Sequence, residues 1–208
     1  MQKFLAESIG TFFLVLTIGC TVLSGASGVI PPLAIGSALM VMVFAGGHIS
    51  GAHYNPAVTL GVFLRGKCTA AEVPLYLAAQ FAGALAAALT VGFLRPDAHP
   101  VAAHPDVARA LVCELLFTFA LVYVVLNTAT AKASEGNSFY GLAIGFTVLT
   151  GAFAVGDISG GAFNPAVAVG VSVMGLAAWS NLWIYLVGNF GGPALAAMAY
   201  KFLHGEGE

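Results

Sequence analysis

The sequence contains very little charge. Its 208 residues include 7 Lys or Arg and 9 Asp or Glu. Only 8% of the residues are therefore charged, whereas a soluble domain contains about 25%. So few charges cannot cover a soluble core, and this excludes a disordered chain, a nucleic-acid-binding protein and most soluble enzymes. The surface is expected to contact a lipid bilayer.

Cysteine is also scarce. Cys20, Cys68 and Cys113 are scattered, and none belongs to a C-x-x-C motif. They predict neither a disulfide framework nor a metal site, and no cofactor is expected. No nucleophile–base pair appears either, so the sequence does not favour an enzyme. Glycine, by contrast, is abundant, and its 26 residues favour closely packed membrane helices.

Apolar runs dominate the sequence. A helix needs about 20 apolar residues to cross a bilayer core of about 30 Å. Six runs approach that length, at roughly 4–24, 32–46, 72–94, 108–128, 138–154 and 179–203. Two shorter runs cover roughly 55–64 and 164–174, and about 10 helical residues rise only about 15 Å. We expect an all-α integral membrane fold with six transmembrane helices and two half-helices.

The basic residues predict an orientation. One side of the six-span arrangement carries Lys3, Arg65, Lys67, Lys132 and Lys201, and the other carries Arg95 and Arg109. The positive-inside rule makes the first side cytoplasmic, with both termini inside. Short loops favour a cell (inner) membrane. Residues 1–28 could alternatively form a signal peptide, but Glu7 interrupts the apolar run.

The chain contains an internal repeat. Residues 47–58, G-H-I-S-G-A-H-Y-N-P-A-V, match residues 156–167, G-D-I-S-G-G-A-F-N-P-A-V, at eight of twelve positions with an offset of 109. We therefore expect one channel domain, 1–208, built from repeats of about 1–95 and 107–208. Each repeat has three spans, and because three is odd, the second repeat should be inverted in the membrane.

Each repeat contains an Asn-Pro-Ala triplet. The two triplets are Asn55-Pro56-Ala57 and Asn164-Pro165-Ala166. Asn is a favoured N-cap and Pro suits the first helical position, so each triplet should begin a half-helix. Ordinary loop turns are the alternative, but two triplets inside a shared match disfavour it. The residues before them, 51–54 and 160–163, are expected to be extended.

Two facing half-helix N-termini would repel cations. Each carries about half a positive charge, and a cation about 4 Å from one end is repelled by about 2 kcal/mol at an effective dielectric of about 20. The two Asn amides could donate hydrogen bonds to a water oxygen in the gap. Such a water would point its hydrogens away along the pore, which breaks a proton wire.

Three polar residues are candidates for supporting the half-helix loops. Glu7 and Glu114 lie inside spans at equivalent repeat positions. They could be a proton relay or ion site, but we favour a role as hydrogen-bond acceptors for the irregular loops. His48 precedes the first triplet, and we expect it to be a loop-packing or vestibule residue; a pH gate is the alternative.

With these motifs the chain resembles the major intrinsic proteins (aquaporins and aquaglyceroporins) over nearly its whole length. The resemblance is carried by the paired Asn-Pro-Ala triplets, the A-E-x-x-G-T-F start at Ala6 and the S-G-x-H-x-N-P-A-V-T stretch at Ser50. It implies a homotetramer with one pore per subunit. It also implies that the two glutamates support the loops before the half-helices.

The chain departs from this family pattern at the selectivity filter. Most members continue the second triplet with Arg, but here the residue is Val167. The family spacing places the other filter positions at Ile35, Ala152 and Gly161. This set has no charge, aromatic ring or imidazole, so it predicts a wider, apolar constriction and some proton leak.

We expect a passive transmembrane channel for water and small uncharged solutes of the glycerol, urea or peroxide type. One alternative is a channel that prefers bulkier neutral solutes, such as metalloid hydroxides, over water. From other classes, a coupled secondary transporter also uses inverted repeats and broken helices, and a closed structural membrane protein remains an alternative.

Overall fold

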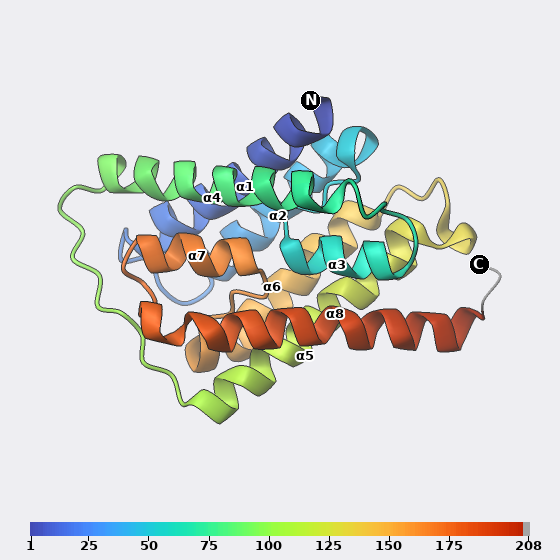
Figure 1. The fold of residues 1–208 in the computed structure, drawn as a ribbon. Coiled ribbons are helices and arrows are strands. Elements are labelled where there is room, and N and C mark those ends of the chain that lie inside the picture. Colours follow the sequence, from blue (N-terminus) through green and yellow to red (C-terminus); the bar gives the residue numbers. More distant parts are fainter. Residues whose placement is uncertain (206–208) are drawn as a thin grey trace.

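The structure is a computed structural model that describes residues 1–205. Its six long helices form a bundle around two short ones (Figure 1). The long helices are α1 (Gln2–Val22), α2 (Ile30–Ser50), α4 (Val73–Leu94), α5 (Val107–Val125), α6 (Tyr140–Ser159) and α8 (Leu182–His204). The short helices are α3 (Pro56–Leu64) and α7 (Pro165–Val173). A π-helical turn, η1 (Leu126–Thr130), and two 3-10 turns, η2 (Lys132–Ser134) and η3 (Trp179–Asn181), complete the helical segments of the described part. The expected fold class is confirmed.

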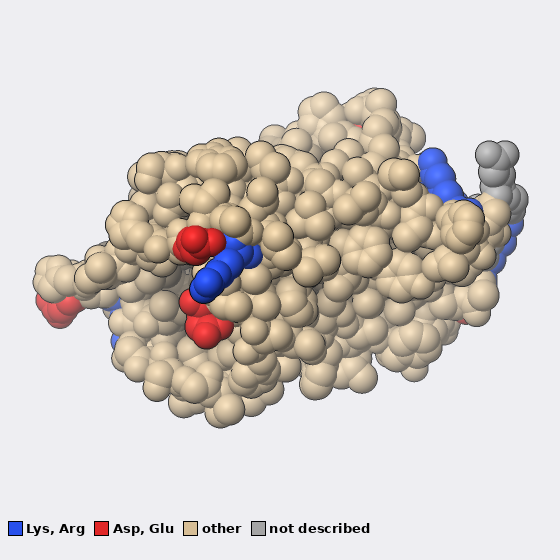
Figure 2. Space-filling view, turned by 90° about the horizontal axis from the view of Figure 1, so that it is seen from below, with Lys and Arg blue, Asp and Glu red and all other residues tan. Residues whose placement is uncertain are grey.

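The outside of the bundle is apolar. All six long helices are long and apolar enough to cross a membrane. Large hydrophobic side chains point outward, including Leu89, which is 71% exposed, and Phe93, which is 83% exposed. Figure 2 shows a broad region without Lys, Arg, Asp or Glu between charged side chains that lie toward the two ends of the molecule. An apolar exterior of this kind is typical of a membrane protein, and the chain is a multi-pass integral membrane protein.

Two helices run further than the apolar pattern predicts. α2 continues to Ser50 and α6 to Ser159, beyond the expected ends at 46 and 154. Both stop where a glycine adopts the left-handed conformation, Gly51 with φ 85° and Gly160 with φ 91°. The polar residues that interrupt the apolar pattern therefore lie in the last helical turn, and the C-cap glycine sets the end of each helix.

Glycines bring the long helices into backbone contact. A Cβ added to Gly192 on α8 would lie 2.6 Å from the backbone nitrogen of Phe119 on α5. The matching Gly83 on α4 packs against the backbone of Ser8 on α1. At the crossing of α2 and α6, Gly36 and Gly145 each face the other's carbonyl oxygen. These glycines let the long helices pack closely against one another around the half-helices.

The half-helices lie end to end in the interior, with their N-termini toward each other (Figure 1). The loop between α4 and α5 lies at the opposite end of the bundle from the end of α8 at His204 (Figure 1). Near the N-terminus, Lys3 pairs with Glu72 at the start of α4. The helices thus position two short segments that together replace one membrane span.

Candidate functional site

The two triplets cap their half-helices in the same way. Asn55 and Asn164 have extended backbones, with φ of −158° and −161°. The side-chain oxygen of Asn55 accepts a hydrogen bond from the backbone N–H of Ala57 at 2.8 Å. That of Asn164 accepts from Ala166 at 2.9 Å and Val167 at 3.3 Å. Each asparagine is therefore a helix N-cap, with proline at the first helical position.

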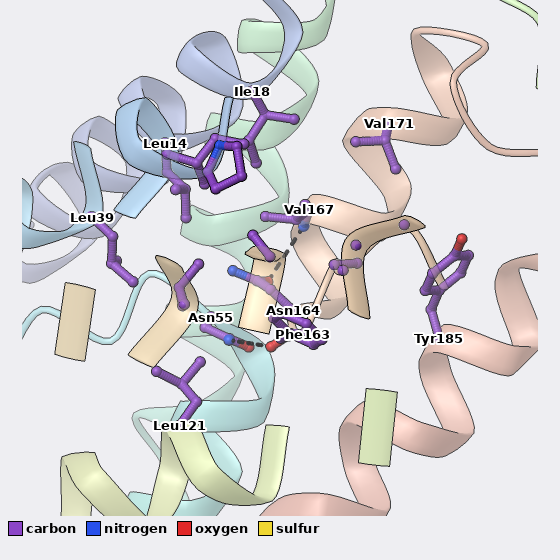
Figure 3. A pocket seen from close by; sticks show the side chains of 18 of the residues that line it. Leu14, Ile18, Leu39, Asn55, Leu121, Phe163, Asn164, Val167, Val171 and Tyr185 are labelled. Carbon is purple, nitrogen blue, oxygen red and sulfur yellow. Dashed lines mark hydrogen bonds between the residues drawn. The ribbon is translucent and has the colours of Figure 1, made fainter. Parts of the chain in front are cut away.

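The two asparagines also link the repeats. The side-chain nitrogen of Asn55 donates to the carbonyl oxygen of Phe163 at 2.8 Å (Figure 3), and that of Asn164 donates to the carbonyl oxygen of Tyr54 at 2.9 Å. Each amide has two N–H groups, so one of the two is committed to the opposite loop. Only the second N–H of each amide therefore remains available to donate a hydrogen bond into the gap, whereas the sequence-based expectation did not distinguish the two.

The loops before the triplets are not extended, which corrects the sequence-based expectation. In the first loop, Gly51, Ala52 and Tyr54 have φ of 85°, 52° and 51°. In the second loop, φ is 91° at Gly160, 64° at Gly161 and 47° at Phe163. Positive φ at these positions lets N–H groups of each loop point toward one side, where they can bind an anion.

In the first loop that anion is Glu7. Its carboxylate is fully buried and accepts from the backbone N–H groups of His53 at 2.9 Å and Tyr54 at 2.7 Å. It also accepts from the Ser50 hydroxyl at 2.7 Å and the Gln80 amide at 2.8 Å. Four donors thus surround one carboxylate, which satisfies its charge within the protein.

Glu114 has the same position in the second repeat. It accepts from the backbone N–H groups of Ala162 at 3.0 Å and Phe163 at 2.8 Å, and from the Ser159 hydroxyl at 2.8 Å. The carboxylates hold the two loops by equivalent bonds, and the strained backbone persists because these bonds fix it.

Sequence reasoning missed several members of this network. Tyr76 donates to the carbonyl of Ser50 at 2.5 Å, and Tyr185 donates to that of Ser159 at 2.8 Å. Gln80 and the buried Asn189 also occupy matched positions. All three pairs are 109 residues apart, the offset of the triplets themselves. That shared offset was the signal that could have revealed them.

His48 lines a cavity near the first loop, in keeping with the expected vestibule position, and its role in loop support stays a prediction. Its side chain is exposed and makes no hydrogen bond with any residue in the range 1–205. His53 is the buried histidine of this region: its Nδ1 lies 3.1 Å from the Thr59 hydroxyl oxygen, and its ring packs on Tyr76. The longer α2 explains the difference, because it carries His48 on a helical turn before the loop begins.

The loop carbonyls remain open. The N–H groups of residues 51–54 and 160–163 all donate within the protein. Within the described residues, the carbonyls of 51–53 and 160–162 accept no hydrogen bond, and both stretches border a cavity. The loops therefore offer acceptors to a passing solute.

A cavity of about 340 Å³ leads to the two asparagines, and we call it the Val167 cavity. Most of its side chains are aliphatic, including Leu14, Leu39 and Leu121 (Figure 3). All four residues expected at the filter line it, namely Ile35, Ala152, Gly161 and Val167. Asp, Glu, Lys and Arg are absent from its lining among the described residues.

Two further cavities lie on the other side of the asparagines, with volumes of about 460 and 270 Å³. Lys67 lines both, and we call them the Lys67 cavities. His53 lines the smaller of them as well as the Val167 cavity. The aliphatic Val167 cavity thus differs from the two Lys67 cavities, which have charged side chains in their walls.

Comparison with known proteins identifies this arrangement. The family model described as "Major intrinsic protein" matches residues 1–200. The chain belongs to the major intrinsic protein family. Aquaporin NIP1-1 from Oryza sativa subsp. japonica is 39% identical over 98% of this chain and 74% of its own length. Aquaporin NIP1-4 from the same organism is 36% identical over 100% of this chain and 79% of its own length.

The fold agrees with a solved structure. The X-ray structure of the aquaglyceroporin from Plasmodium falciparum superposes with a TM-score of 0.82, and it covers 96% of this chain and 94% of that one. The two sequences are 24% identical, so the likeness establishes the fold. In this major intrinsic protein the residue that follows the second triplet is Val167, and its side chain is buried.

Proposed function

We propose that the chain is a passive channel for water and small uncharged solutes, with a single pore per subunit. The observation that carries this proposal is the meeting of two half-helix N-termini beneath an open apolar cavity, with each asparagine bonded to the opposite loop. Solutes would lose apolar contact at this point and gain hydrogen bonds to loop carbonyls and asparagine amides. No enzymatic activity is proposed.

Ions are excluded mainly by the half-helix ends. The triplets Asn55-Pro56-Ala57 and Asn164-Pro165-Ala166 form the constriction, where two positive dipole ends face each other. A cation there also loses its hydration, because the cavity wall above is aliphatic and offers it no carboxylate. Water keeps its hydrogen bonds at this point, so it passes where a cation does not.

We propose that Ile35, Ala152, Gly161 and Val167 form the filter. Their side chains donate no hydrogen bond, and the N–H of Val167 is already bonded to Asn164. Such a filter selects mainly by width. This favours a second candidate function, a channel that passes bulkier neutral solutes such as metalloid hydroxides better than water.

Assembly and location are also part of the proposal. Family resemblance supports a homotetramer, the short loops support the cell (inner) membrane, and the distribution of basic residues supports cytoplasmic termini. The exposed apolar helix faces would contact neighbouring subunits or lipid.

The test is a flux panel on purified protein in liposomes. Stopped-flow light scattering would measure water, glycerol, urea and boric acid permeability against empty liposomes. We expect water flux well above the lipid background, and neutral solute flux that follows only the solute gradient. Uphill solute uptake driven by an imposed proton gradient would instead establish a coupled transporter, and absence of all flux would establish a closed protein.

A further inference from the structure

Lys67 lies directly beyond the end of α3, and its backbone is fixed there. The N–H of Gly66 donates to the carbonyl of Phe63 at 2.8 Å, and the N–H of Lys67 donates to that of Val62 at 3.0 Å. Gly66 has φ of 81°. These features define a Schellman turn, which ends the half-helix and directs the next residue back along the bundle.

The second repeat contains the same turn. The N–H of Gly175 donates to Ser172 at 3.1 Å, that of Leu176 donates to Val171 at 2.9 Å, and Gly175 has φ of 75°. Leu176 is the counterpart of Lys67 at the repeat offset of 109, and it lines the Val167 cavity. In both repeats the turn therefore brings its final residue to a cavity wall. This residue is Leu176 in the Val167 cavity and Lys67 in the Lys67 cavities.

The Lys67 ammonium group is available to the pore. Its side chain is exposed, lines both Lys67 cavities and makes no ion pair or hydrogen bond within residues 1–205. The other charges in the smaller cavity are Lys3 and Glu72, which pair at 2.7 Å. The hydrogen bond from Lys3 lowers the pKa of Glu72 to about 2, and the formal charges of this ion pair offset each other.

The larger of these cavities also has lysine and glutamate in its wall, Lys132 and Glu135. The formal charges of Lys132 and Glu135 again sum to zero. Among the Lys, Arg, Asp and Glu residues in the described lining, Lys67 therefore supplies the net charge of both Lys67 cavities. The histidines that face the smaller cavity are His48 and His53. Among residues 1–205, none of these four charged residue types lines the Val167 cavity.

We propose that Lys67 is a specificity-determining residue that excludes cations at the mouth of the pore opposite the filter. The inference rests on the proposed channel function. It places a cation barrier at the other end of the pore from the position where most family members carry arginine. A cation about 7 Å from one positive charge is depleted about 3-fold at a dielectric of about 80 and about 50-fold at about 20.

The test measures cation leak and water flux on the same proteoliposomes. A potassium diffusion potential would drive protons or guanidinium inward, read with an internal pH dye or a guanidinium uptake assay in about 10 mM salt. We expect Lys67→Leu, which copies Leu176, and Lys67→Gln to raise the leak by at least about 3-fold. Water permeability should stay within about twofold of the unsubstituted protein, since the half-helices and filter are unchanged.

Two further variants test whether charge is the cause. Lys67→Arg should keep the low leak, and the double variant Lys67→Leu with Leu176→Lys should restore it by placing the ammonium group at the matched turn. Lys201→Gln is the matched control, because Lys201 lies at the same end of the molecule but lines none of the three cavities. Salt near 1 M should reduce the difference, because the screening length falls from about 30 Å to about 3 Å.

The outcomes separate this inference from the channel itself. Unchanged leak in Lys67→Leu and Lys67→Gln, with water flux retained, would overturn the role of Lys67 and leave the proposed channel intact. A leak that rises equally in Lys201→Gln, or that persists at high salt, would also overturn it. Absence of water flux in the unsubstituted protein would overturn the channel function.

Discussion

We expect solute preference to depend most on a single residue, Val167. Its side chain lines the Val167 cavity beside the second triplet, and it offers no hydrogen-bond donor. An arginine there would add bulk, donors and a positive charge to an otherwise aliphatic wall. The consequences for large and small solutes should therefore differ.

We expect Val167→Arg to lower glycerol and urea permeability by about tenfold, an increase of about 1.4 kcal/mol in the barrier. Water permeability should fall much less, because water needs a narrower opening. Stopped-flow measurements on proteoliposomes would check this, with Val167→Leu as a control that adds little bulk and no donor. An equal loss for water and the larger solutes would refute the filter assignment.

Glu7 is the residue that holds the first loop. We expect Glu7→Gln to lower the free energy of unfolding by about 2–4 kcal/mol, because the new amide group faces donors that the carboxylate accepts. Water flux should fall as well, since the loop carries the Tyr54 carbonyl that Asn164 needs. Thermal unfolding in detergent and liposome swelling would measure the two effects.

The control for this substitution is Glu135→Gln, which changes an exposed glutamate near η2 in the same chemical way. It should leave the unfolding midpoint unchanged. If Glu7→Gln behaved like this control in both assays, the carboxylate would not be the support of the loop.

At the scale of helices, packing depends on glycines whose neighbours are backbone atoms. A Cβ on Gly192 would lie 2.6 Å from the Phe119 nitrogen and 2.8 Å from the Leu115 carbonyl oxygen. Neither atom can move without shifting α5. By contrast, a Cβ on Gly92 of α4 meets no atom within 4 Å.

These two glycines should respond to the same substitution with opposite signs. Gly192→Ala should destabilise the protein by about 1–3 kcal/mol, through separation of α5 and α8. Gly92→Ala should be neutral or stabilise it by up to about 1 kcal/mol, because alanine favours the helix and fits without a clash. Unfolding midpoints in detergent would compare them, and a similar loss in both would contradict the role of close packing.

The half-helices could be predicted closely from the sequence, whereas the loops could not. Asn-Pro specifies a helix start through local chemistry. The predicted runs 55–64 and 164–174 therefore agree to within one residue with the observed helices, Pro56–Leu64 and Pro165–Val173. The loop backbone depends instead on a carboxylate 46 or more residues away. Local sequence cannot show which way the N–H groups must turn.

The positions of several candidate site residues could likewise be predicted by comparing the two repeats. The two triplets and Val167 follow from matched spacing, and Ile35 and Ala152 line the same cavity as Val167. Their role in selection stays a prediction. The burial of His53 could not be predicted, because a single histidine has no periodic signal and its ring packs on that of Tyr76 on α4.

At the scale of the whole molecule, the two ends differ in charge, and this predicts an orientation. In a variant with Cys20, Cys68 and Cys113 replaced by serine, we expect Asp97→Cys to react with a membrane-impermeant maleimide on intact cells. Glu135→Cys should react only after permeabilisation. Both positions are exposed, so accessibility alone decides the result. Labelling in the reverse pattern would contradict the placement of both termini in the cytoplasm.

The hydrogen bonds that cross between the repeats also constrain how the protein is made. Asn55 and the Tyr54 carbonyl are synthesised first, yet their partners Phe163 and Asn164 follow about 109 residues later. At about 5–20 residues per second, the ribosome needs roughly 5–20 s to supply them. During that interval the first half of the chain must keep polar groups hydrated or shielded inside the membrane. We therefore expect the newly synthesised first repeat to depend on the insertion machinery until the second repeat is made. A chain truncated between the repeats would lack these partners and would keep that dependence.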